Sequence, residues 1–217
     1  MSEGAVQLRK LTPKGEAMRQ RIIEAAAGLI YERGVAGTNN ELVRAAAGIS
    51  GSQLSHYFPD KESLVRAVIV WRADTMIGLH RVPPLGELDS VGALRDWADW
   101  YGAEFDVRSG GCSFGSLAAE IMKSDLRVHD EIAAGFDRWR DLFERGLVTM
   151  RERGELRRSA DPRQLAYALM AAFQGGMLLT QSAQDPTPMR EALNAAVDHV
   201  ASFAPRQRRA PAATRTR

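Results

Sequence analysis

Apolar residues recur at helical spacing along most of the chain, and no segment of useful length alternates with the period of two that a half-buried strand needs. The first apolar stripe consists of Met18, Ile22, Ala25, Ala26, Leu29 and Ile30. Thr12 can cap the helix that carries this stripe, and Pro13 at its first position loses no hydrogen bond. Gly34 is placed to end the helix, because glycine is favoured just past a helix end.

Proline and glycine breaks divide the rest of the chain into further helices. The breaks at residues 83–86 and 109–111 separate helices predicted at about 60–80, 89–107, 113–123, 128–153, 161–183 and 187–203. Asp161-Pro162 and Thr187-Pro188 repeat the pattern of a capping residue followed by proline. We therefore predict an all-α protein of about nine helices, with a domain boundary near residues 75–88.

Residues 38–58 carry the most informative local pattern. Thr38 and Glu41 form a predicted capping box that starts a short helix, and Gly48 is expected to stop it. Ser50 and Gln53 form a second capping box directly afterwards. Two short helices joined by a three-residue turn that contains glycine are typical of a helix-turn-helix, predicted here at about residues 39–58.

The second helix of this pair, at residues 51–57, has a composition unlike that of a core element. Apart from Leu54, its side chains are short or hydrogen-bonding and uncharged at neutral pH. A short helix with such a face suits the DNA major groove, which is about 12 Å wide, and glutamine or serine can bond base edges or phosphates there. The alternative is an exposed corner of an unrelated helical bundle.

Composition and charge narrow the class of protein. The chain has 217 residues, of which 45% are hydrophobic and 26% charged, which is typical of a globular protein. Its net charge is +2, but residues 1–70 carry +2, residues 71–204 carry −5, and residues 205–217 carry five arginines and no acid. We expect residues 1–11 and the basic tail at 205–217 to be disordered. The tail is either a solubilising segment or an accessory arm that contacts phosphates.

Several classes of site and location are disfavoured. No apolar run is long enough to span a membrane, residues 1–10 lack the features of a signal peptide, and a cytoplasmic location is expected. The single Cys112 excludes an intramolecular disulfide and a multi-cysteine zinc site. His80 and His129 lack partners at metal-ligand spacing, and no nucleophile–base pair or phosphate loop is present. We therefore expect no metal, no cofactor and no catalytic residues.

Residues 21–68 resemble the tetracycline-repressor (TetR) family of bacterial transcription regulators. The resemblance is carried by EAA at residues 24–26, ELVRAAAGIS at 41–50 and LSHYFPDKESL at 54–64. It implies a three-helix DNA-binding domain at residues 12–76 with residues 51–57 as the recognition helix. It also implies a helical ligand-binding and dimerisation domain at residues 77–204, entered through the helix at about 60–80.

The resemblance assigns roles to individual residues. Ser52, Gln53 and His56 match positions that face bases or backbone, and Thr38, Tyr57 and Lys61 match positions that contact phosphates. Two departures stand out, because Ser55 occupies a position where the family usually has tyrosine, and Asn40 one that is usually apolar. The candidate DNA-binding residues are Thr38, Ser50, Ser52, Gln53, Ser55, His56, Tyr57 and Lys61.

An effector site is expected in the second domain. Residues 110–120 look like a segment of one subgroup of the family, in which a cysteine opens a ligand-domain helix. A thiol near a helix N-terminus is more reactive, so Cys112 either senses oxidants or electrophiles or is a small buried residue. An apolar or aromatic small molecule is the expected ligand. The candidate pocket residues, which could equally be plain core, are Trp100, Cys112, Phe114, Phe136 and Trp139.

The last two predicted helices are rich in small residues, which let helices approach closely. The residues concerned are Ala166, Ala168, Ala171, Ala172, Gly175, Gly176, Ala192, Ala195 and Ala196. The resemblance implies that these helices form a four-helix interface in a homodimer, whereas internal packing is the alternative. The resulting hypothesis is a homodimeric, ligand-responsive repressor of a palindromic double-stranded DNA operator. The alternative is a helical small-molecule-binding protein or enzyme that has lost DNA recognition.

Overall fold

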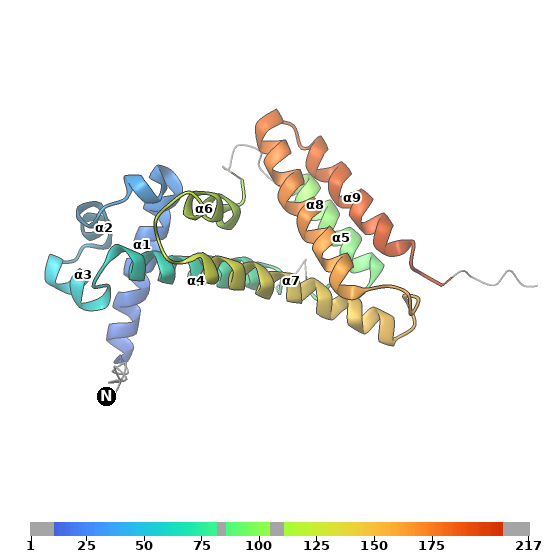
Figure 1. The fold of residues 1–217 in the computed structure, drawn as a ribbon, viewed down its shortest axis with the longest axis horizontal. Coiled ribbons are helices and arrows are strands. Elements are labelled where there is room, and N and C mark those ends of the chain that lie inside the picture. The colour runs from blue at the N-terminus through green and yellow to red at the C-terminus, as the bar shows by residue number, and fades with distance from the viewer. Residues whose placement is uncertain (1–10, 82–85, 105–110, 206–217) are drawn as a thin grey trace, which may run out of the picture. The chain divides into compact units, whose positions relative to one another are not determined.

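The computed structural model describes residues 11–81, 86–104 and 111–205, and within these ranges it contains nine α-helices and no strand (Figure 1). The predicted all-α class is therefore confirmed. The helices are α1 (Pro13–Gly37), α2 (Asn40–Ala47), α3 (Gly51–Tyr57), α4 (Lys61–Leu79), α5 (Val91–Glu104), α6 (Ser113–Ile121), α7 (His129–Glu152), α8 (Pro162–Ala183) and α9 (Thr187–Ala201). The expected disorder of residues 1–10 and 206–217 lies outside the described residues.

The chain forms two compact units. The first contains the chain up to Met76 together with Ser113–Phe136, and so includes α1, α2, α3, α6 and most of α4. The second contains Ile77–Cys112 and the chain from Asp137 onward, with α5, α8 and α9. Sequence analysis had placed residues 113–136 in the second domain, whereas here they pack with the first unit.

A contact between α1 and α6 accounts for this grouping. The regular helix of α1 breaks at Gly34, which has a φ of 74°, and the next backbone N–H, of Val35, donates to the Glu120 carboxylate at 2.6 Å. Phe114 of α6 also packs on Gly135 of α7 so closely that a Cβ there would lie 2.4 Å from the phenyl ring. Such long-range partners are not encoded in the helical pattern of residues 113–123.

The helix ends agree with the sequence in part. Thr12 caps α1 and Asp161 caps α8 as predicted, each accepting backbone N–H groups of the first turn. The predicted capping role of Thr187 is wrong, because α9 begins at Thr187 itself and its hydroxyl donates to Asp185.

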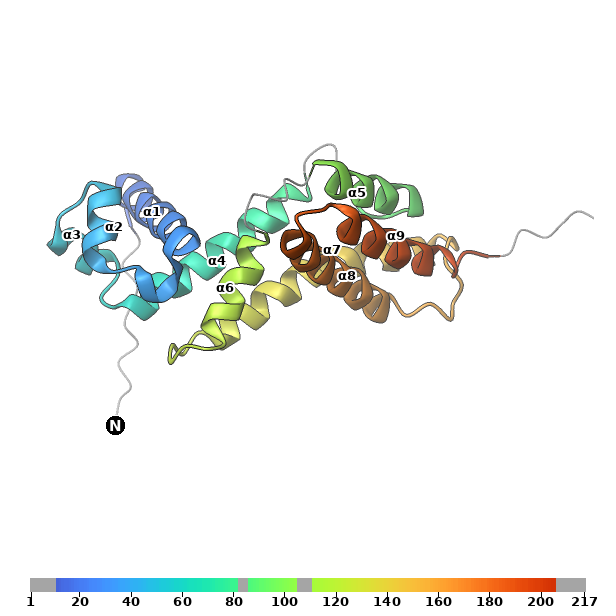
Figure 2. The same cartoon turned by 90° about the horizontal axis from the view of Figure 1, so that it is seen from above.

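In the second unit α8 packs along α9, and α5 packs on α9 (Figure 2). The approach of α8 to α9 is close at Gly176, where a Cβ would lie 3.1 Å from the Cα of Met189. The buried hydroxyl of Thr180 accepts the backbone N–H of Met189 at 2.8 Å, which ties the start of α9 to α8. Within the described residues, no helix combines the length and apolar composition needed to span a bilayer.

Candidate nucleic-acid interface

Two short helices in the first unit, α2 and α3, form a helix-turn-helix. Gly48 follows the last residue of α2 and caps it, and its φ of 62° is the left-handed conformation that favours glycine, as predicted. α3 begins three residues later, at Gly51, behind a complete capping box, in which the Ser50 hydroxyl accepts the Gln53 N–H at 3.2 Å and the Gln53 side chain accepts the Ser50 N–H at 2.9 Å. Leu54, only 2% exposed, anchors the inner side of α3.

The start of α2 differs from the prediction. Asn39 caps this helix by accepting the N–H of Leu42 at 3.0 Å, so the predicted capping box of Thr38 and Glu41 is wrong. Thr38 is 4% exposed, and its hydroxyl donates to the carbonyl oxygen of Gly34 at 2.9 Å. This side chain therefore braces the end of α1, and its burial removes it from reach of a phosphate.

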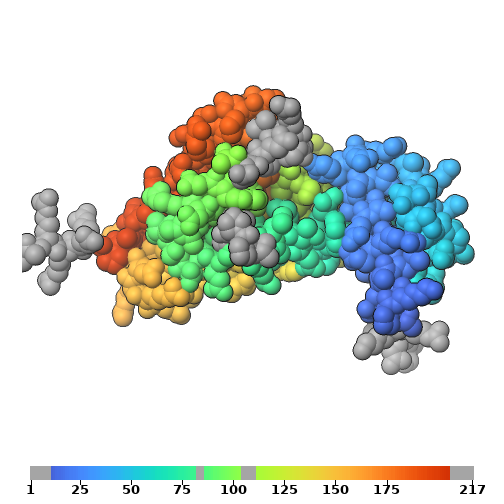
Figure 3. Space-filling model, turned by 180° about the vertical axis from the view of Figure 1, so that it is seen from behind, coloured from blue at the N-terminus to red at the C-terminus, as the bar shows by residue number. Residues whose placement is uncertain are grey.

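The outer side of α3 is solvent-exposed. In the space-filling view of Figure 3 the light-blue atoms of α2 and α3 lie at the surface of their unit. Tyr57 is half-buried, and its ring makes an edge contact with that of His56, with centroids 5.0 Å apart. The remaining predicted residues of this surface are exposed, namely Ser50, Ser52, Gln53, Ser55 and His56.

A hollow of about 350 Å³ lies between the start of α1 and the outer side of α3. Thr12, which caps α1, and Lys14 and Gly15 of α1 line it on one side, and residues of α3 that include Gln53 and His56 line the other. Sequence analysis missed Lys14 because the α1 stripe shows which face of the helix is buried, but not that its first turn lies beside α3. Lys14 adds a cation beside α3, a helix whose own sequence contains no lysine or arginine.

Lys61 lies at the first position of α4 and is exposed. Asp60 precedes it and accepts the Ser63 N–H at 2.7 Å, and this bond holds the pKa of the Asp60 carboxyl below its usual range. A helix N-terminus disfavours a cation, so helix stability does not explain a lysine at this position. Lys61 is exposed shortly after the end of α3, and its contact with a phosphate stays a prediction.

Comparison with known proteins identifies the family. Residues 22–68 match the family model for bacterial regulatory proteins of the tetR family, and residues 92–196 match that for the tetracyclin repressor-like C-terminal domain. The chain belongs to the tetR family. It is a DNA-binding transcription regulator with an N-terminal helix-turn-helix domain and a helical C-terminal domain.

One relative and two solved structures align over most of the chain, and a second relative aligns over about a third of it. The HTH-type transcriptional repressor DhaR of Mycobacterium sp. (strain GP1) is 25% identical over 178 residues, which are 81% of this chain and 88% of DhaR. KstR2 of Rhodococcus jostii (strain RHA1), another repressor of this type, is 34% identical over 76 residues, 35% of this chain and 37% of KstR2. A TetR regulator from Chloroflexus aurantiacus J-10-FL superposes with a TM-score of 0.74 at 24% identity, covering 89% of this chain and 98% of that one. The reduced form of NemR from E. coli superposes with a TM-score of 0.71 at 21% identity, covering 87% of this chain and 97% of that one.

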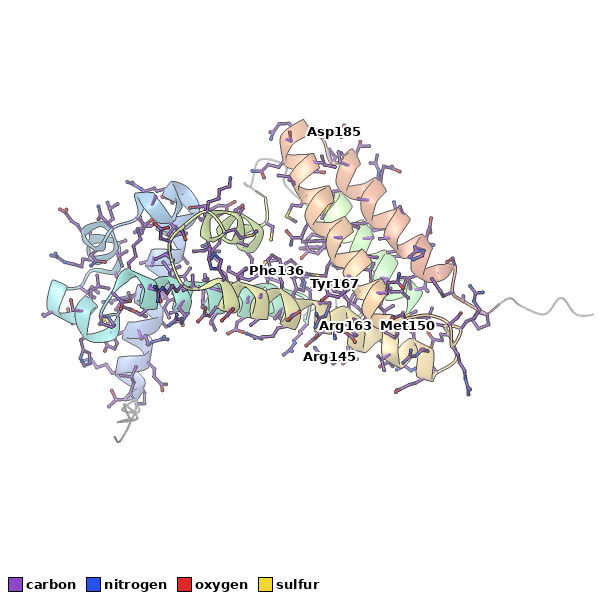
Figure 4. The ribbon with its side chains drawn as sticks, in the orientation of Figure 1. Phe136, Arg145, Met150, Arg163, Tyr167 and Asp185 are labelled. Carbon is purple, nitrogen blue, oxygen red and sulfur yellow. The ribbon has the colours of Figure 1, made fainter. Side chains whose placement is uncertain are left out.

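The five predicted effector-pocket residues of this tetR regulator are divided between the two units. Phe114 and Phe136 belong to the first unit, where their ring centroids lie 4.8 Å apart. Trp100, Cys112 and Trp139 belong to the second. Two surface hollows described in the second unit, of about 550 and 610 Å³, are lined by none of the five. Figure 4 shows Arg145 of α7 and Arg163 of α8, which both line the larger hollow.

Cys112 directly precedes α6, as the sequence pattern predicted. It is 8% exposed, and its sulfur accepts a hydrogen bond from the side-chain amide of Gln174 on α8 at 3.6 Å. The thiol therefore lies inside the C-terminal domain and not on its surface, so a reagent reaches it only through a gap between side chains.

One side of α8 is apolar and exposed. Tyr167, Leu178 and Leu179 are 49%, 67% and 58% exposed, and Ala171 and Gly175 lie exposed between them at helical spacing. Two of the small residues named from the sequence, Ala166 and Gly176, are instead buried inside the unit. The small residues of α8 thus serve both internal packing and an outward face.

Proposed function

We propose that this protein is a homodimeric repressor that binds a near-palindromic operator and is released from it by a small molecule. The observation that carries the proposal is the exposed polar side of α3, rigidly held by a capping box and by Leu54. A helix of this kind fits a major groove, where its side chains meet base edges. DhaR and KstR2, which are named as repressors, support repression as the direction of control.

Base and phosphate contacts are assigned to different residues. Ser52, Gln53, Ser55 and His56, on the exposed side of α3, are the candidates for contact with bases or nearby backbone. A second set lies around the ends of neighbouring helices and is assigned to phosphates, namely Lys14, Ser50, Tyr57 and Lys61. Phosphate contacts set the position of the protein on DNA, and base contacts set its sequence preference.

Dimerisation is assigned to α8 and α9. The exposed apolar side of α8, with Leu178 and Leu179 at its C-terminal end, is of the kind that a second copy covers. A twofold axis would bring two α3 helices to successive major grooves, about 34–36 Å apart. An operator with two related half-sites follows from this symmetry.

Release of the operator requires that the effector bind the two conformations of the protein with unequal affinity. An effector that binds the DNA-incompetent conformation more tightly shifts the population toward it, and the operator is freed in proportion to that difference. The α4 helix passes from the first unit into the second, with residues up to Met76 in one and Ile77–Leu79 in the other, and is the proposed carrier of the coupling.

A mobility-shift assay on the DNA upstream of the protein's own gene tests this function. We expect a discrete complex whose apparent affinity falls steeply between 50 and 200 mM salt, by roughly 10³ or more for six or more phosphate contacts. Absence of any complex at low salt would contradict the proposal and favour a helical small-molecule binder that has lost DNA recognition.

A further inference from the structure

Six aromatic side chains form a buried cluster within the second unit. Phe173 of α8 lies at its centre, with ring centroids 5.8 Å from Trp97, 5.2 Å from Trp139 and 4.7 Å from Tyr101. Phe143 of α7 contacts Trp97 at 5.1 Å, and His80, which follows α4, contacts Trp139 at 5.6 Å. The cluster therefore joins α5, α7 and α8 with the residue that follows α4.

Two indole N–H donors inside this cluster have no acceptor among the described residues. Trp97 and Trp139 are 0% and 1% exposed, and neither indole N–H reaches an acceptor among the residues that the structure describes. Buried tryptophan N–H groups are normally bonded, because an unpaired donor away from water is costly. Phenylalanine at both positions would fill an apolar core without this cost, so the two indoles are poorly explained as packing alone.

The cluster's edge is polar but uncharged. Burial raises the pKa of the Tyr101 hydroxyl above its usual value, and the nearby Cys112 thiol adds to this effect. The Gln174 amide, which bonds Cys112 at 3.6 Å, lies at the same edge. None of the six side chains is a carboxylate, a lysine or an arginine, and burial of a charged ligand without a paired charge is costly, so a neutral ligand suits the cluster best.

We propose that this aromatic cluster is the effector site, and that it takes a small, neutral, aromatic molecule bearing a carbonyl-type oxygen. The oxygen accepts hydrogen bonds from the indole N–H groups of Trp97 and Trp139. The ring of the ligand stacks among the surrounding aromatic side chains after Phe173, which contacts both indoles, moves aside. This assignment rests on the proposed effector-released repressor and adds the chemical class of the effector.

A matched pair of probes tests the assignment. Acetophenone and ethylbenzene have similar shapes, but only acetophenone carries an acceptor oxygen. We expect the full-length protein to bind acetophenone about tenfold more tightly, the factor of one or two net hydrogen bonds, as measured by quenching of tryptophan fluorescence and by thermal shift. Equal affinity for the two probes, or no binding of acetophenone, would overturn the assignment.

Three tryptophan variants test which indole N–H groups cause the preference for acetophenone over ethylbenzene. Trp97→Phe and Trp139→Phe keep an aromatic ring but remove one N–H each, so each should reduce the preference for acetophenone severalfold. Neither should lower the melting temperature through loss of a hydrogen bond, since neither N–H has an acceptor among the described residues. The control Trp71→Phe, in the first unit, should keep the wild-type preference. If both cluster variants keep it as well, the indoles are not the donors and the assignment is wrong.

The same preparations are assayed on the upstream DNA. Operator binding without any preference for acetophenone would overturn the effector class and leave the repressor function standing. A preference that depends on Trp97 and Trp139 in a protein that binds no DNA would support the site and contradict the repressor function. A failure of the proposed effector class can therefore be distinguished from a failure of the proposed repressor function.

Discussion

At the scale of single residues, the observed capping role of Gln53 competes for its side chain with the proposed base contact. Its Oε1 accepts the Ser50 N–H within the capping box, which leaves the exposed amide N–H group as a donor. A bidentate contact with adenine needs both the acceptor and the donor of glutamine. In this conformation Gln53 is instead suited to donate to an acceptor, such as O6 or N7 of guanine or O4 of thymine.

Replacing Gln53 with alanine should reduce discrimination between operator and random DNA by about 1–3 kcal/mol, the usual value of a good base contact. Competition mobility shifts at a fixed salt concentration measure this difference. Because the variant also loses half of the capping box, its thermal stability is measured in parallel, with operator and random DNA compared at a temperature where it is folded. Equal losses on both DNAs would contradict a base-reading role.

Lys61 and Lys14 should behave differently from Gln53. Lys61→Ala and Lys14→Ala should each weaken binding to all DNA sequences and reduce the slope of log affinity against log salt by about 0.9 for each lost phosphate contact. Lys123→Ala, an exposed lysine in the turn after α6, is the matched control and should leave the slope unchanged. A lysine variant whose slope equals that of the wild type makes no phosphate contact.

At the scale of elements, helix positions were predictable because their signals are local. The caps by Thr12, Asp161 and Ser50 need only side chains within three residues of the groups they bond. The N-cap of α2 was predicted at the wrong residue because threonine and asparagine can both cap a helix. The contacts of the folded chain decide which of Thr38 and Asn39 is free to do so. In the folded chain Thr38 is committed to Gly34, and Asn39 takes its place.

Replacing either of two helical glycines with alanine should change the free energy of unfolding, in opposite directions for the two. A Cβ on Gly146 of α7 would lie 2.0 Å from the carbonyl oxygen of Leu88, a backbone atom that cannot move away cheaply. Gly146→Ala should therefore lower the free energy of unfolding by about 1–3 kcal/mol. A Cβ on Gly28 of α1 would meet nothing within 4 Å, and Gly28→Ala should raise it by about 0.5–1 kcal/mol. Urea unfolding measures both, and destabilisation by Gly28→Ala or none by Gly146→Ala would contradict the described packing.

At the scale of the whole molecule, the sequence predicted the all-α class, the helix-turn-helix and the family. It did not predict that residues 113–136 pack with the first unit, because the Glu120 bond to Val35 joins residues 85 positions apart. It named Phe114 and Phe136 as candidate pocket lining but did not predict that their rings pair in the first unit, and their role in a pocket stays a prediction. Helical spacing identifies aromatic side chains, but only tertiary packing decides which of them meet.

The exposed side of α8 predicts the oligomeric state. Leu178→Glu combined with Leu179→Glu places two charges on the proposed dimer interface, and should give a monomer by analytical ultracentrifugation. Met122→Glu is the matched control, since Met122 is 72% exposed and lies in the first unit, and it should remain a dimer. Operator binding should be lost with the dimer, because one half-site offers half the contacts. A double variant that stays dimeric would place the interface elsewhere.

Methylation protection of guanine N7 on the operator tests the central claim most directly, because this atom lies only in the major groove. If α3 reads the major groove in a twofold dimer, binding should protect guanines in two patches whose centres lie about 10–10.5 base pairs apart, or a multiple of this spacing. Gln53→Ala should weaken protection in both patches. Binding without any protection of guanine N7 at a site that contains guanines in both half-sites would contradict the account.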